Sequence, residues 1–219
     1  MLAELERARP DLIVSGGDLT WGPLPAETFG LASGLNARFV RGNADRAVLE
    51  NESSTDRGQW MQAHHTTEMR EFLAGFEEHV AVEVDGLGPV RFCHGSPRSD
   101  EECVTPETPE ARVREFTEGV EERVIVTAHV HIQFDREVAG IRGVNAGSVG
   151  LPYEGMPGAY WALLGPDVEL RRTEYDVDDA VARYRATDFP GVEELIELML
   201  TPPEPREVID HAEQVVFAG

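Results

Sequence analysis

The sequence contains no lysine, so all 19 of its basic side chains are arginine, against 41 acidic ones. The formal net charge is therefore -22 at pH 7, and the isoelectric point lies near 4.6. Proteins hold polyanions through basic surface that releases counterions, and such surface is scarce here. The composition argues against long nucleic acids and anionic membranes as partners. It leaves a small phosphorylated substrate open if a metal ion supplies the positive charge.

Cysteines and long apolar runs are also scarce. The two cysteines, Cys93 and Cys103, form no CxxC pattern, and we expect both to be reduced thiols in a cytoplasmic protein. Nowhere do about 18 apolar residues run together, and the first ten residues lack the apolar core of a signal peptide. Secretion and membrane spanning are therefore not expected.

The 219 residues, 41% of them apolar, are enough for one domain with a sizeable core. We expect a single domain over residues 1–219, with a core over 1–175 and a C-terminal helical extension over 176–219. Periodicity predicts helices at 1–9, 60–76 and 108–119 and a hairpin at 79–93. Short runs at 134–139, 141–145, 159–164 and 168–175 predict an antiparallel meander in a second sheet, and helices are predicted near 178–186, 191–200 and 206–215.

Residues that can bind a cation follow four apolar runs. The run at 124–128 leads to His129 and His131, a spacing that suits a buried strand delivering two imidazoles to the edge of a sheet. Three other runs end in Asp18, Asn43 and His94. Each is weak evidence alone, because Gly-Gly-Asp and Gly-Asn are common turns and two histidines can cap a strand. Together the five favour a metal site.

These residue types suit a pair of divalent cations that activates water and clamps the oxygens of a phosphoester. Asp18 fits a bridging carboxylate, because Gly16 and Gly17 let the backbone turn sharply before it. Asn43 offers a neutral amide oxygen, which leaves the metal a strong Lewis acid. The three histidines supply imidazole, a ligand that suits zinc, manganese or iron.

The motifs, in their order along the chain, resemble those of the calcineurin-like metallophosphoesterases, in particular their small bacterial phosphodiesterase branch. They are Gly-Gly-Asp18, Gly-Asn43-Ala-Asp45, His94-Gly95, Ala128-His129-Val-His131 and Asn145-Ala-Gly-Ser148. Over about residues 1–175 the resemblance implies an α/β fold, a four-layer αββα sandwich of two mixed β-sheets flanked by helices. It implies hydrolysis of a small phosphoester, most often a diester, by a metal-bound hydroxide.

The resemblance also implies residue roles. Asp18 would bridge two metals, with Asn43, His94 and His129 on one and His131 on the other, and Asp18, Asn43 and His94 would be catalytic. Manganese would be the metal, with iron, zinc, nickel or magnesium as alternatives. Up to two ions would bind per chain.

The sequence departs from the family in two places that matter. Members usually begin with a strand ending in Asp-x-His, which supplies ligands to the second metal, and no such motif precedes Asp18. We therefore expect a chain truncated at its N-terminus, with a weakened second site. Ala44 stands where many members carry a histidine assigned to protonate the leaving group, so turnover of alkyl phosphates should suffer more than that of activated diesters.

Several other residues have two alternative roles. Arg46 and Arg98 could contact a substrate phosphate, or pair with Asp45 and with Asp100 or Glu101, respectively. Gln133 and Tyr153 could shape specificity at the site's mouth. The remaining histidines, His64, His65, His79 and His211, are expected to face solvent. The C-terminal helices, with Val208, Ile209, Val215, Val216 and Phe217, should cover a sheet or form the seam of a homo-oligomer.

Three interpretations remain open from the sequence. The chain is a metal-dependent phosphoesterase, as the five metal-binding residues suggest. Alternatively, it is a catalytically weakened or inactive protein of the same fold that serves as an interaction scaffold, similar to the retromer subunit with this architecture. The third interpretation is that the sequence is a fragment of an active enzyme.

Overall fold

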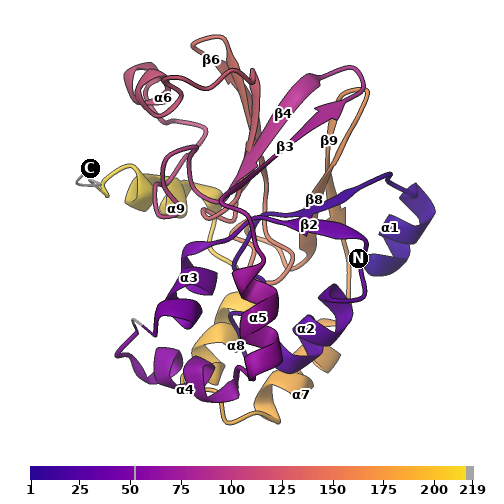
Figure 1. Ribbon diagram of the computed structural model, residues 1–219. Helices are drawn as coiled ribbons and strands as arrows, with labels where there is room; N and C mark the ends of the chain where they lie inside the picture. The colour runs from indigo at the N-terminus through magenta and orange to yellow at the C-terminus, as the bar shows by residue number, and fades with distance from the viewer. Residues whose placement is uncertain (52, 216–219) are drawn as a thin grey trace.

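The computed structural model describes residues 1–51 and 53–215 (Figure 1). Its main sheet has five strands in the order β3-β4-β5-β7-β6. The middle strands β4, β5 and β7 run parallel, and the outer strands β3 and β6 pair antiparallel with their neighbours. Every residue of β5 is buried, as expected of a parallel strand covered on both faces. The bounds are β3 His79–Val84, β4 Gly88–Cys93, β5 Val124–Thr127, β6 Gln133–Val138 and β7 Ile141–Ala146.

The predicted hairpin at 79–93 is confirmed, but the predicted four-stranded meander is wrong. Its first two strands, β6 and β7, join the main sheet, because β7 pairs in parallel with β5. Only its last two strands, β8 (Ala159–Leu164) and β9 (Val168–Thr173), form a separate antiparallel sheet. The backbone groups of a buried strand need partners on both edges, and β7 satisfies the second edge of β5.

The two faces of the main sheet are covered differently. Ile125 points toward α6 (Glu110–Phe116) and α9 (Pro205–Ala212), whose buried side chains share its cluster. Val124 and Val126 point the other way and pack with side chains of the β8–β9 sheet. Alternate residues of one strand therefore reach opposite faces, as the two-residue period of a strand requires.

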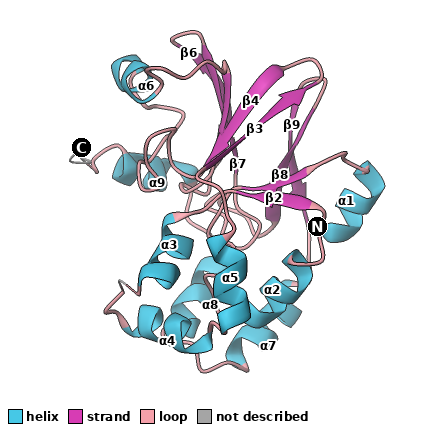
Figure 2. Cartoon of the chain, in the orientation of Figure 1, coloured by secondary structure: helices cyan, strands magenta, loops and turns pink. Residues whose placement is uncertain are grey.

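A short parallel sheet and a group of helices complete the layers. Strand β1 (Ile13–Ser15) pairs with β2 (Ala37–Phe39), and Phe39 packs into the cluster formed by the helices. Figure 2 shows these helices gathered below the strands. This αββα layering confirms the predicted fold class. The remaining helices are α1 Leu2–Ala8, α2 Pro25–Ala32, α3 Asn43–Glu50, α4 Asp56–His64, α5 Thr67–Ala74, α7 Val177–Arg185 and α8 Val192–Leu200.

The helix predicted at 60–76 is in fact two helices. The chain turns extended at His65, and the Thr66 side chain then accepts a hydrogen bond from the amide of Met69, which begins α5. A threonine cap of this kind competes with continued helix, so the break is local in origin. His65 itself is 6% exposed, contrary to the prediction that it faces solvent. Its ring is fixed between the Met61 carbonyl and the Thr20 hydroxyl.

The C-terminal helices pack on the protein as predicted, with α9 covering the main sheet through Ile209. Val216 and Phe217 lie outside the described residues. Both cysteines are free thiols, also as predicted. Within residues 1–51 and 53–215, none of the helices has the length and apolar character that a bilayer crossing requires.

Candidate metal centre

A glycine-rich loop after β1 delivers Asp18 to the site. Gly17 has φ 101°, and a side-chain carbon there would lie 2.7 Å from a ring nitrogen of His94. Gly42 is packed as closely, since an added Cβ would lie 2.0 Å from Oδ1 of Asp18. Because β1 and β2 are parallel neighbours, the residues after both strands meet at one edge, and Asn43 arrives beside Asp18. Gly17 is therefore required by its positive φ and by close approach, and Gly42 by close approach alone.

Asp45 holds the two loops together, a role that the sequence analysis missed. Its buried carboxylate accepts hydrogen bonds from the backbone amides of Asp18 at 2.7 Å, Gly42 at 2.9 Å and Leu19 at 3.2 Å. Burial, together with the nearby charge of Asp18, raises the pKa of Asp45 to about 7. The signal available in the sequence was an acidic residue three positions after Gly42 at a helix start.

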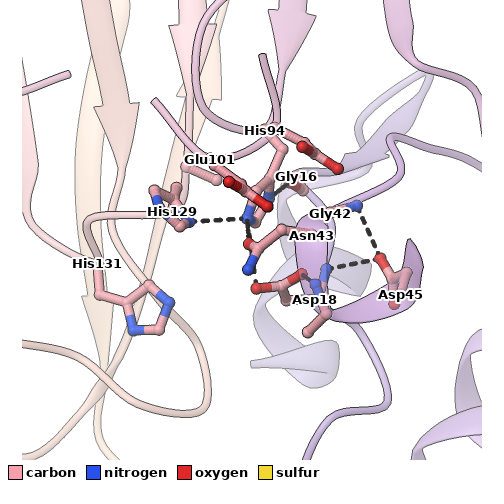
Figure 3. Close-up of polar contacts among 12 residues, drawn as sticks. Gly16, Asp18, Gly42, Asn43, Asp45, His94, Glu101, His129 and His131 are labelled. Atoms are coloured by element: carbon pink, nitrogen blue, oxygen red, sulfur yellow. Dashed lines mark hydrogen bonds and ion pairs between the residues drawn. The ribbon is translucent and has the colours of Figure 1, made fainter. Parts of the chain in front are cut away.

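His94 lies at the centre of the site (Figure 3). Its Nδ1 lies 2.6 Å from the Gly16 carbonyl oxygen, so this nitrogen carries the proton and donates it. Its Nε2 faces three electron-pair donors: Oδ1 of Asn43 at 3.0 Å, Nδ1 of His129 at 3.2 Å and Oδ2 of Asp18 at 3.3 Å. One proton cannot satisfy so many lone pairs, whereas a cation can. Burial lowers the pKa of His94, but the hydrogen bond and charge of Asp18 outweigh it, and the pKa is raised.

The neighbouring His94 in turn shifts the pKa of Asp18. Burial raises the pKa of its carboxyl, but the hydrogen bond and charge of His94 and the amide of Ala44 at 2.8 Å lower it overall. Asp18 therefore stays ionised, as a metal ligand must.

His129 and His131 are both anchored by the backbone. The backbone of Glu101 faces the His129 ring and raises the pKa of that ring against burial, and Nδ1 of His131 lies 2.7 Å from the Leu151 carbonyl oxygen. Burial and the neighbouring His94 lower the pKa of His129 to about 4, and burial lowers that of His131. Metal-binding histidines commonly give one ring N–H to a carbonyl in this way, which fixes the other nitrogen for a ligand.

Backbone strain is concentrated at the same residues. Of the six non-glycine residues with positive φ in the described chain, three are Asp18, His129 and His131, with φ of 55°, 59° and 59°. Such conformations cost on the order of 1–3 kcal/mol each and persist where the surroundings over-determine them. Their coincidence with the predicted metal-binding residues favours a functional site.

The structure brings four of the five predicted residues together. Single ligand atoms of Asp18, His94 and His129 lie within 4.8 Å of one another, and the Asn43 oxygen adjoins the same His94 nitrogen. His131 stands apart from this group in Figure 3. The donors, with their protons directed outward to carbonyls, fit a divalent cation bound by oxygen and imidazole nitrogen.

The two candidate phosphate-binding arginines already contact carboxylates. Arg46 lies 2.7 Å from Asp100 and 2.6 Å from Glu101. Arg98 pairs with Glu102 and Glu115 instead of the Asp100 or Glu101 that the sequence suggested. A role for either arginine in substrate binding stays a prediction, and a phosphate would have to compete with these partners.

The two candidate specificity residues differ in their surroundings. The Gln133 amide donates to the carbonyls of Ala146, Trp161 and Arg171, so it joins β6 to β7, β8 and β9 and is committed to the fold. The Tyr153 ring stacks on His131, with centroids 5.1 Å apart and planes inclined at 28°. Tyr153 therefore lies beside the site.

Comparisons with known proteins agree with this geometry. A family model described as the calcineurin-like phosphoesterase superfamily domain matches residues 1–165. A hypothetical protein from Pyrococcus horikoshii OT3 superimposes with a TM-score of 0.71 at 20% identity, over 93% of this chain and 90% of that one. A metallophosphoesterase from Sphaerobacter thermophilus gives 0.68 at 24% identity, over 89% and 91%. At these identities the structures show a shared fold, and no curated protein matches the chain.

Proposed function

Because this chain belongs to the calcineurin-like phosphoesterase superfamily, we propose that it is a metal-dependent phosphoesterase acting on a small phosphodiester. The observation that carries the proposal is the convergence of three donor atoms on Nε2 of His94, each within 3.3 Å. A scaffold would have no need of a carboxylate, an amide and imidazoles with their lone pairs directed at one point.

Asp18, Asn43, His94 and His129 would hold one divalent cation, and Asp18 and His131 would hold a second one more weakly. Manganese is the first candidate, with iron, zinc, nickel and magnesium as alternatives. When bound, the metal would supply positive charge that activates water and neutralises charge on the phosphate. Asn43, a neutral ligand at the start of α3, would add no negative charge against the substrate.

The charges around the centre support a diester over a monoester. A diester carries one negative charge near pH 7, whereas a monoester carries up to two. Arg46 is already compensated by Asp100 and Glu101, and Arg98 by Glu102 and Glu115. With the nearby arginines paired and the chain strongly acidic, the metal would be the main source of positive charge for the substrate.

Position 44 favours a good leaving group. The backbone amide of Ala44 donates a hydrogen bond to Asp18, and its side chain has no proton to donate to a leaving group. Loss of general-acid help typically costs about 10²–10⁴-fold in rate. Diesters with aryl leaving groups need that help least, so they are the substrates on which we expect activity to be seen.

The test combines metal content with hydrolysis. Protein purified without added metal and then soaked in manganese should hold at least one ion per chain and cleave bis(p-nitrophenyl) phosphate faster than p-nitrophenyl phosphate. His94→Ala should lose both properties, whereas His79→Ala, an exposed histidine on β3, should keep them. The proposal fails if the wild-type protein binds no metal, if it cleaves neither ester, or if His94→Ala behaves as wild type.

The scaffold interpretation has Ala44 in its favour. It predicts a protein that binds metal and hydrolyses neither ester, so the same experiment separates the two functions.

A further inference from the structure

The segment of residues 201–213, here called the buttress segment, contains α9 and lies beyond the residues matched by the family model. Its last residue, Glu213, fixes the chain that follows Glu101. One oxygen of Glu213 accepts hydrogen bonds from the hydroxyls of Thr105 at 2.6 Å and Thr108 at 2.9 Å, and both threonines are buried. Glu101, four residues before Thr105, has its backbone facing the His129 ring.

A second contact supports His131 from its neighbours in the chain. Ile209, on α9, is buried in one apolar cluster with Val130 and Ile132, the residues on either side of His131. These two apolar side chains point into the core. The helix α9 that covers them therefore also restrains the backbone of His131, which lies between them.

A third contact supports the loop that orients the His131 ring. The Pro203 carbonyl accepts a hydrogen bond from the Gly155 amide at 2.9 Å. Gly155 has φ 67°, and an added Cβ would lie 2.6 Å from a Glu204 carboxylate oxygen, so loop and buttress segment fit closely. The same loop carries Leu151, which holds Nδ1 of His131, and Tyr153, which stacks on its ring.

These contacts converge on the two histidines whose backbones are left-handed. Such conformations persist only when surrounding structure fixes them. We propose that the buttress segment is a positioning element that holds His129 and His131 in the orientation required for metal binding. This inference rests on the proposed metal site, but the orientation of the rings can be measured without metal.

The test compares Ile209→Ala with Ile196→Ala, a buried isoleucine on α8 whose cluster contains none of the site residues. Both variants should lower the melting temperature. Only Ile209→Ala should shift the imidazole nitrogen resonances of His129 and His131 in metal-free protein at fixed pH. It should also weaken manganese binding by about tenfold or more, the range seen when outer-shell support is lost.

A second pair of variants, which removes less packing, tests the inference if Ile209→Ala does not fold. Glu213→Ala should shift the same resonances, whereas Glu207→Ala, an exposed residue of α9, should not. Unchanged imidazole resonances in both Ile209→Ala and Glu213→Ala would overturn the inference. If wild type binds no manganese, the proposed function fails, and the metal-free resonances still decide whether the segment positions the histidines.

Discussion

Replacing Gly42 by alanine should displace Asp18 and weaken metal binding. Gly42 has φ −89° and ψ 170°, a conformation that alanine adopts without strain, so any effect must come from the added carbon. That carbon would lie 2.0 Å from Oδ1 and 2.6 Å from the backbone nitrogen of Asp18, whereas ordinary contact begins at 3.4 Å. The Asp18 carboxylate must therefore move by about 1.4 Å and its backbone must shift as well, so the hydrogen bond from Ala44 at 2.8 Å cannot survive unchanged.

A shift of this size should weaken manganese binding by about 10–100-fold, or ~1.4–2.7 kcal/mol. Isothermal titration calorimetry of wild type and Gly42→Ala measures the loss. Gly30→Ala is the matched control, because Gly30 lies within α2 with no neighbouring atom inside 4 Å of an added carbon. It should leave metal affinity unchanged and gain up to ~1 kcal/mol of stability from helix propensity. A manganese affinity in Gly42→Ala equal to that of wild type would refute the placement of Asp18 against Gly42.

Three further predictions concern the site and its surroundings. Because the pKa of His94 is raised, its bound proton stabilises the metal-free protein at low pH, and this stabilisation is lost as the pH rises through that pKa. The proton competes with the metal, so manganese affinity should fall about tenfold for each pH unit below the pKa of His94. Titrations at several pH values that show a constant affinity would contradict this. Thr20→Val leaves the buried His65 ring without its 2.8 Å partner and should cost ~1–3 kcal/mol in urea unfolding, where an unchanged midpoint would count against the bond. Ala44→His should raise kcat on alkyl diesters by ~10²-fold and on aryl diesters by less, and equal gains would show that leaving-group protonation is not what the site lacks.

Much of the fold could be predicted because its signals are local. The hairpin at β3–β4 follows from alternating apolar residues, and β5 follows from a continuous apolar run. The meander was wrong for a non-local reason. Nothing within β7 says that it will pair with β5, whose residues lie 18 positions earlier in the chain, instead of continuing into β8. Strand pairing depends on which edges remain unsatisfied in the assembled sheet.

The buried histidine at position 65 shows the same limit. In the sequence His65 sits in a polar stretch beside His64, and no periodic signal marks it as buried. Its partner, Thr20, lies 45 residues away. Only the docking of α4 against the loop after β1 reveals that the ring is enclosed.

The chemistry available at the candidate site could be predicted from the sequence. Asp18, Asn43, His94, His129 and His131 each follow an apolar run, and the ends of buried strands are where a sheet presents polar groups. Gly16 and Gly17 also indicated a sharp turn before Asp18, although the atoms that the glycines approach could not be read from the sequence.

How those groups are arranged in space depends on tertiary structure. It brought Asn43 to Asp18 by pairing β1 with β2, and it aimed the nitrogens of His94 and His131 with the carbonyls of Gly16 and Leu151. A ring's orientation is set by the hydrogen bond that its other nitrogen makes, and in both cases that partner comes from a distant part of the chain. The identity of a ligand is therefore local information, and its direction is not.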